Sequence, residues 1–215
     1  MPTVGEQRTE FLGTESQKRP FASAFSHEKE QAEPGYYSVF LDTYGVKAEL
    51  TSTERAAMHR YTFPESREAG FILDMDYNIQ QQINQVMEVE AVNDTVLRGY
   101  KRSAYWAYRQ DLYFYAVFSK PFTHTLYTDT VQENGKEIPV CKMLLHFETA
   151  EDEQVLAKFS ISSVDADGAC KNLQAEMPGW NFDGVRADAK KKWNECLSKI
   201  AVKTHDEDQR TIFYT

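Results

Sequence analysis

Residues 142–162 read KMLLHFETAEDEQVLAKFSIS, and their alternation decides the fold. Every second residue of each half is apolar: Met143, Leu145 and Phe147 before the acidic turn, then Val155, Ala157, Phe159 and Ile161 after it. A period of two is typical of β-strands that bury one face. The same period recurs in residues 71–78, 86–91 and 112–118, so strands dominate from Tyr36 to about Ser162.

Turn residues separate these alternating runs. Tyr44-Gly45 and Asn93-Asp94 lie between runs, and Asn134-Gly135 is the pair that two-residue hairpin turns favour. Roughly ten strands separated by turns at about 8 to 15 residues indicate a mainly β fold with a large antiparallel sandwich. Residues 1–35 are polar and turn-rich, and predict irregular structure with one or two short strands.

After Ser162 the period becomes that of helices. Ser163 is expected to cap a helix that ends near Glu176, and Asp183 to cap a second one. The second helix has an apolar stripe made of Val185, Ala189, Trp193, Cys196, Leu197 and Ile200. Thr204 and Glu207 have capping-box spacing for a third helix, and no residue typical of a helix end follows. We therefore expect a piece of a longer protein.

Composition excludes several classes of function. The 215 residues include 24 Lys and Arg against 33 Asp and Glu, a net charge of −9, which argues against a general nucleic-acid binder. No apolar run approaches the roughly 18 to 20 residues of a membrane-spanning helix. The three cysteines are far apart and form no CxxC pair, so neither a zinc knuckle nor a disulfide scaffold is indicated.

Two carboxylate pairs have spacing compatible with acid–base chemistry. Asp74 and Asp76 share one strand face, as do Glu88 and Glu90. Glycoside hydrolysis uses such a pair, one as acid and one as base or nucleophile. Solvated strand faces carry the same pattern, and that interpretation is favoured because alternation alone accounts for it.

A histidine and two glutamates stand in a loop before the first clear strand. The segment FSHEKEQAEPGYY contains His27, Glu28 and Glu30, and loops often carry binding groups. The other four histidines are scattered without metal-ligand spacing. The aromatic-rich stretch from Tyr105 to Phe118 is compatible with a sugar platform, but packing in a large core is favoured.

Two long stretches resemble a known family. They are FSHEKEQAEPGYYSVFLDTYGVKAELTSTERAAMHRYTFP, residues 25–64, and AEMPGWNFDGVRADAKKKWNECLSKI, residues 175–200, which leads into DEDQRTIFYT. Both resemble glycoside hydrolase family 92, the calcium-dependent, inverting α-mannosidases found largely in bacteria. In that family an N-terminal β-sandwich is joined by a helical linker to a catalytic (α/α)6 barrel.

The resemblance implies a division of the chain into three parts. Residues 1–162 would be the β-sandwich, with its N-terminal part missing. Residues 163–205 would be the helical linker, and residues 206–215 would open the first helix of the missing barrel.

The resemblance also implies where the chemistry lies. The family's general acid, general base and most calcium contacts come from the barrel, so no catalytic and no metal residue is carried over to this chain. Calcium would belong to the parent enzyme, and none is expected to bind this chain alone. His27 and Glu28, within the family-like FSHE, are the candidates for the substrate cleft or the domain interface.

The leading hypothesis is therefore a non-catalytic N-terminal part of an α-1,2-mannosidase, inactive alone, whose parent removes terminal α-mannosides with inversion. Its partners would be the catalytic domain and mannose-containing glycans, with no nucleic acid and no membrane span. Periplasmic or secreted localisation is expected, with the signal upstream of Met1. A stand-alone carbohydrate-binding or interaction module, and a purely structural domain, are the alternatives.

Overall fold

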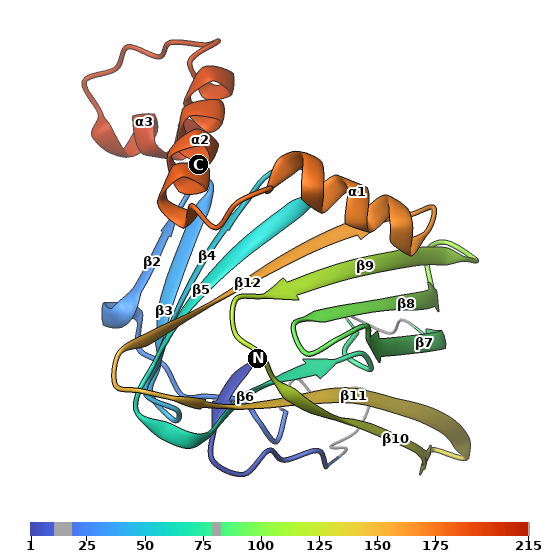
Figure 1. The fold of residues 1–215 in the computed structure, drawn as a ribbon. Helices are drawn as coiled ribbons and strands as arrows, with labels where there is room; N and C mark the ends of the chain where they lie inside the picture. Colours follow the sequence, from blue (N-terminus) through green and yellow to red (C-terminus); the bar gives the residue numbers. More distant parts are fainter. Residues whose placement is uncertain (11–18, 79–82, 215) are drawn as a thin grey trace.

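Two antiparallel β-sheets pack on each other as a sandwich, and helices lie against the larger one (Figure 1). The structure is a computed structural model that describes residues 1–10, 19–78 and 83–214. The predicted mainly β sandwich with C-terminal helices is confirmed. Of the segment 1–35, residues 2–4 and 30–33 form short strands, and residues 11–18 lie outside the described ranges.

The larger sheet has eight strands in the order β2-β3-β4-β5-β12-β9-β8-β7. All of its neighbouring strands are antiparallel. Its strands are β2 (Glu30–Glu33), β3 (Tyr36–Leu41), β4 (Val46–Ser52), β5 (Ala56–Phe63), β7 (Ile83–Ala91), β8 (Val96–Ala104), β9 (Gln110–Phe118) and β12 (Glu153–Ser162).

The smaller sheet has four strands in the order β1-β6-β11-β10. They are β1 (Pro2–Val4), β6 (Ser66–Asp74), β10 (Thr123–Glu133) and β11 (Lys136–Thr149). The hairpin between β10 and β11 turns at Asn134 and Gly135, whose φ angles of 52° and 74° are those of the predicted tight turn. The quoted stretch 142–162 spans β11 and β12, so its acidic turn passes from one sheet to the other.

The main core lies between the two sheets. Met143 and Leu145 of β11 and Val155 and Ala157 of β12 are almost fully buried, as their alternation predicts. Rings from both sheets meet there, and the centroids of Phe71 on β6 and Phe118 on β9 are 5.5 Å apart. This inner face of the large sheet is therefore closed by the small sheet.

The outer face of the large sheet carries a second core beneath two helices. The helices are α1 (Ala166–Glu176) and α2 (Phe182–Leu197), while η1 (His27–Lys29) and α3 (Glu207–Tyr214) lie outside this layer. Met58 of β5 is buried against Leu173, Met177 and Phe182. The helices also satisfy polar groups of this face, since Lys158 and Ser160 of β12 donate to the carbonyls of Met177 and Ala169.

The N-cap residue of each α-helix differs from the one that the sequence predicts. α1 is capped by Asp165 instead of Ser163, and α2 by Asn181 instead of Asp183. For α3, Asp206 accepts the amides of Asp208 and Gln209. Thr204 instead accepts the amide of Asp206. In each case an Asp or Asn side chain reaches the free amides of the first turn, which makes it the effective cap.

The apolar stripe predicted on the second helix is only partly buried. α1 ends at Glu176 as expected, but α2 ends at Leu197, so Ile200 lies beyond it. Ala189 is buried, whereas the Trp193 side chain is 50% exposed and Cys196 is exposed. On α3, Ile212 and Phe213 are 77% and 50% exposed.

The contact between β6 and β11 at Gly70 gives a test of the inter-strand packing. A Cβ at Gly70 would lie 2.0 Å from the carbonyl oxygen of Leu145, whereas a Cβ at Gly179 would meet nothing within 4 Å. Gly70→Ala should lower the free energy of unfolding by about 1–3 kcal/mol, because overpacking forces backbone shifts. Urea unfolding measures this effect, and Gly179→Ala is the matched control. Equal stability of the two variants would contradict the packing described.

Candidate functional site

His27 and Glu28, the candidates from the sequence, lie in η1. Ser26 caps this short helix by accepting the Glu28 amide. His27 Nδ1 lies 2.5 Å from Glu30 Oε2, and the Tyr37 hydroxyl donates to Glu30 Oε1 over 2.6 Å. The hydrogen bond from Tyr37 and then that with His27 lower the pKa of Glu30. The hydrogen bond to Glu30, followed by burial, raises the pKa of Tyr37 to about 12.

This loop lies at the end of the large sheet away from α2. β2 leaves η1 and runs to the turn at Gly35, which approaches Ala189 of α2 (Figure 1). The His27 side chain is 88% exposed. The loop thus presents an imidazole at the surface, held by Glu30, and no described carboxylate cluster joins it. Whether His27 and Glu28 touch a substrate or a domain stays a prediction.

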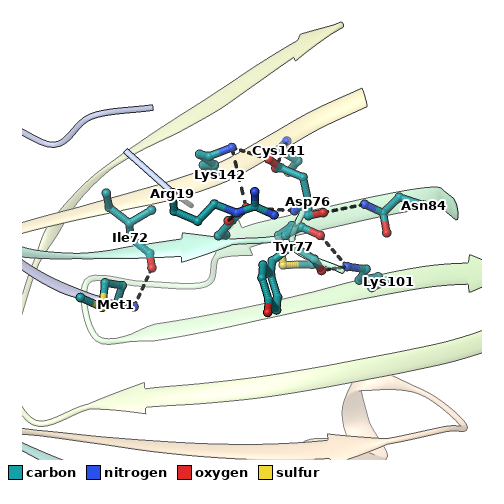
Figure 2. A network of polar contacts seen from close by, with 11 residues as sticks. Met1, Arg19, Ile72, Asp76, Tyr77, Asn84, Lys101, Cys141 and Lys142 are labelled. Atoms are coloured by element: carbon teal, nitrogen blue, oxygen red, sulfur yellow. Dashed lines mark hydrogen bonds and ion pairs between the residues drawn. The ribbon is translucent and has the colours of Figure 1, made fainter. Parts of the chain in front are cut away.

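Asp74 and Asp76 are brought together in a buried ionic cluster (Figure 2). Lys142 on β11 forms a short ion pair with Asp76, and its Nζ lies 3.7 Å from Asp74 Oδ1. Arg19 pairs with Asp74 over 3.1 Å. The Lys142 side chain is 1% exposed and those of the two aspartates 9% and 6%. The interpretation of Asp74 and Asp76 as a solvated strand face is therefore wrong.

A lysine of the large sheet reaches the backbone next to this cluster. Lys101 on β8 of the large sheet donates to the carbonyls of Met75 and Tyr77, which follow β6 of the small sheet (Figure 2). The Asp76 carboxylate also accepts the Cys141 amide over 2.7 Å. Burial, and then the charge of Asp76, raise the pKa of Asp74, and burial lowers the pKa of Lys101.

The geometry of this cluster does not suit glycoside hydrolysis. An inverting pair needs carboxyl groups roughly 6.5–9.5 Å apart with room for water and sugar between them. Asp74 and Asp76 instead converge on one buried ammonium group and have no such space. Their arrangement connects β6 and β11, the two central strands of the small sheet.

The second acidic pair lies on the exposed face of edge strand β7. Glu88 and Glu90 are both solvent-exposed, and Glu90 pairs with Arg98 of β8. The interpretation as a solvated strand face is confirmed for this pair. Exposed ion pairs of this kind contribute little to stability.

The aromatic stretch 105–118 divides into two parts. Phe114 and Phe118 of β9 pack in or against the main core, as expected. Trp106 and Tyr108, in the loop between β8 and β9, are 89% and 99% exposed. The expectation of core packing is therefore wrong for this loop, because the chain turns away from the sheet before β9 begins.

A polar network fixes α2 to the large sheet. Buried Glu49 of β4 accepts hydrogen bonds from Tyr36 and from Arg60, and Arg60 Nη1 also lies 3.2 Å from Asp183 Oδ1 on α2. Burial alone raises the pKa of Glu49, but the Arg60 and Tyr36 hydrogen bonds outweigh it and lower the pKa to about 2. The Arg186 guanidinium lies 3.4 Å above the Tyr36 ring. These contacts make α2 part of the sandwich body.

The described residues include no cluster of side chains suited to bind a metal ion. Within residues 1–10, 19–78 and 83–214, no group of three or more His, Cys, Asp or Glu side chains is placed to hold a metal ion. No described helix is long and apolar enough to cross a membrane.

Two protein-family models match consecutive parts of the chain. Residues 1–162 match the glycosyl hydrolase family 92 N-terminal domain. The chain belongs to glycoside hydrolase family 92. Residues 168–215 match the family 92 catalytic domain, so the match to that domain begins inside α1.

The chain spans less than a third of the length of the solved and curated relatives that it matches. An α-mannosidase of Bacteroides thetaiotaomicron is 33% identical with a TM-score of 0.83, over 94% of this chain and 29% of its own. An inverting mannosidase of the same bacterium shares the fold at 22% identity, with a TM-score of 0.80, over 100% of this chain and 28% of its own. A secreted glycosidase of Arthroderma benhamiae is 26% identical, over 85% of this chain and 27% of its own.

Removing the ammonium group from the ionic cluster tests its structural role. Lys142→Met leaves Asp74 and Asp76 buried without their shared cation and should lower the free energy of unfolding by about 3–5 kcal/mol. Glu90→Gln, at an exposed ion pair of the same family 92 sandwich, is the control and should change stability little. Chemical unfolding measures both. A Lys142→Met variant as stable as the parent would rule out this role.

The burial of His59 should make the stability of the protein depend on pH. It is partly buried on β5, with Nδ1 2.8 Å from the Tyr61 hydroxyl, and burial lowers its pKa from 6.5 to about 4. Between these values the unfolded chain binds a proton that the native state does not, so stability falls as pH falls from 6.5 to 4. The loss from this group is on the order of 2 kcal/mol.

The test compares variants by urea unfolding at pH 7, 5.5 and 4.5. His59→Gln should lose less stability than the parent over this range, whereas His205→Gln, at an exposed residue, should follow the parent. Parallel pH profiles for His59→Gln and the parent would show that His59 is not buried in its neutral form.

Proposed function

We propose that this chain is the N-terminal, non-catalytic part of an α-1,2-mannosidase that removes terminal α-mannosides with inversion of configuration. The match of residues 1–162 to the family 92 N-terminal domain carries the proposal. The 33% identity to a bacterial α-mannosidase supports the activity, and the inverting neighbour of the same fold agrees with inversion.

The domain organisation that we propose follows the change from strands to helices. Residues 1–162 form the β-sandwich, residues 163–205 the helical linker, and residues from 206 onward open the catalytic (α/α)6 barrel. The large sheet ends at Ser162, which supports the first boundary. The catalytic-domain match starts at 168, so it includes α1 and α2 together with α3.

The catalytic carboxylates and the calcium are proposed to belong to the barrel. Asp74 and Asp76 form buried ion pairs with Lys142. Glu88 and Glu90 lie on an exposed edge strand. His27 and Glu28 remain candidates for contacts with the substrate cleft or the domain interface, since both are exposed. We propose that the parent enzyme acts in the periplasm or outside the cell, as the curated relative is a secreted glycosidase.

A stand-alone carbohydrate-binding module is the second candidate. The exposed rings of Trp106 and Tyr108 favour it, because aromatic faces are common in binding sites. Such a module would bind mannosides without any partner domain and would not hydrolyse them.

Mannose release from α-1,2-mannobiose tests the proposed function. The longer protein that contains this chain should release mannose, should lose activity with a calcium chelator, and should yield β-mannose first by NMR. The 215-residue chain should release none, because its described acid pairs cannot serve as acid and base. Calcium-dependent release by the 215-residue chain would contradict the proposal, and Asp74→Asn and Glu88→Gln would then be the first variants to make.

A further inference from the structure

Lys142 is a buried lysine whose amine contacts two carboxylates. Its side chain is 1% exposed, and those of Asp74 and Asp76 are 9% and 6% exposed. In the other lysine–carboxylate pairs of the described residues, the lysine side chain is at least 27% exposed. Burial disfavours the charged forms of amines and carboxylates alike, so their uncharged, reactive forms are most accessible at Lys142.

The strand register brings the three side chains to one point. Lys142 of β11 lies opposite Asp74 of β6, and directly opposed residues project from the same face of a sheet. Asp76 follows β6 by two residues, and its Oδ2 accepts a hydrogen bond from the same amine (Figure 2). The Lys142 nitrogen is therefore in contact with the carboxyl group of Asp76, as a nucleophile must be before it attacks.

The backbone amide of Cys141 polarises the same carboxyl group. It donates to Asp76 Oδ1 over 2.7 Å, which is the oxygen that does not accept from Lys142. A backbone N–H aimed at a carboxyl oxygen stabilises the negative charge that develops there when a nucleophile adds to the carbon. The carboxyl carbon of Asp76 is thus an acceptor with its oxyanion donor already in place.

Asp74 is positioned to move a proton between the reacting groups. Its Oδ1 lies 3.7 Å from Lys142 Nζ and accepts the Asp76 amide over 3.2 Å. Burial, followed by the charge of Asp76, raises the pKa of Asp74, which favours its holding a proton. Its Oδ2 accepts from Arg19 over 3.1 Å, so Asp74 keeps a countercharge after the lysine has reacted.

We propose that Lys142 and Asp76 form an intramolecular isopeptide bond, with Asp74 as the proton-transfer group. The ammonium first gives one proton to Oδ2 of Asp76, and the freed amine adds to its Cγ. Asp74 then takes a proton from the nitrogen and delivers it to the same Oδ2, and the C–Oδ2 bond breaks to release water. One ammonium and one carboxylate become one amide and one water, and Asp74 ends in its original state. The inference does not depend on the proposed function.

Burial and proximity both favour this condensation. Charges taken out of water lose their solvation, and forming the amide removes one charge of each sign from the interior. Two groups held in reactive contact behave as if present at roughly 10⁵–10⁸ M. The bond would close residues 76–142, which include β7 to β10, into a ring and constrain the unfolded chain as a disulfide does. The three cysteines of the chain are free, so none of them provides such a link.

Mass spectrometry of the longer protein, purified folded and then reduced and denatured, tests the inference. Its mass should be about 18 Da below that of its sequence, because one water is lost. Trypsin should release residues 68–98 and 137–158 as one linked product, because a linked Lys142 is not cleaved. Fragment ions should place the bond at Asp76. Unlinked peptides, or a bond at Asp74, would overturn the inference.

Two internal controls accompany the digest. Lys158 is also buried, but its amine donates to the backbone carbonyls of Met177 and Gly179, so trypsin should cleave after it. A loss of about 18 Da without linked peptides would indicate a cyclic imide at an Asp-Gly pair, such as Asp167-Gly168, and would overturn the inference.

Three variants distinguish a covalent bond from an ion pair. Asp76→Asn should still form the bond but lose about 17 Da, because ammonia replaces water as the leaving group. Lys142→Arg keeps the positive charge and should retain its full sequence mass. Asp74→Asn preserves the size of the side chain but cannot transfer the proton, so most molecules should remain unlinked. Full mass for Asp76→Asn would contradict the bond, and complete linkage in Asp74→Asn would contradict the role of Asp74.

Discussion

The need to cover both faces of the eight-stranded sheet determines the rest of this structure. On β5 and β12 the residues that point inward, such as Phe63 and Val155, are buried against the small sheet. The residues that point outward, such as Met58, are buried beneath α1 and α2. The same outer face carries the buried polar side chains of Lys158 and Ser160, whose hydrogen bonds to the Met177 and Ala169 carbonyls require the helices to stay in place. The helices that the family comparison assigns to the catalytic region are therefore also a structural layer of the sandwich.

Polar contacts then set how these layers meet. Within the small sheet, Lys142 neutralises two aspartates, and Lys101 of the large sheet donates to the carbonyls of Met75 and Tyr77 beside them. Beneath α2, Arg60 connects Glu49 of the sheet with Asp183 of the helix. Buried ion pairs add little net stability, but breaking one leaves an uncompensated charge, so they specify a single arrangement. A fixed sandwich and fixed linker helices give a rigid base on which a catalytic domain can be seated.

The sequence predicts most of the fold because alternation records directly which side chains are buried. Met143, Leu145, Val155 and Ala157 are inside as their period requires. The caps are harder to predict, since Asp165 and Asn181 lie within two residues of Ser163 and Asp183, which are also residue types that cap helices. The ionic cluster at Asp76 could not be predicted, because Lys142 and Arg19 reach it from distant parts of the sequence. The exposure of Trp106 and Tyr108 likewise depends on where the loop leaves the sheet, which composition does not reveal.

The most direct test is a structure of the longer protein bound to a mannose-configured inhibitor. The catalytic carboxylates around the inhibitor should come from residues outside 1–215. A structure in which Asp74 or Asp76 contacts the inhibitor would contradict the non-catalytic role described for this chain.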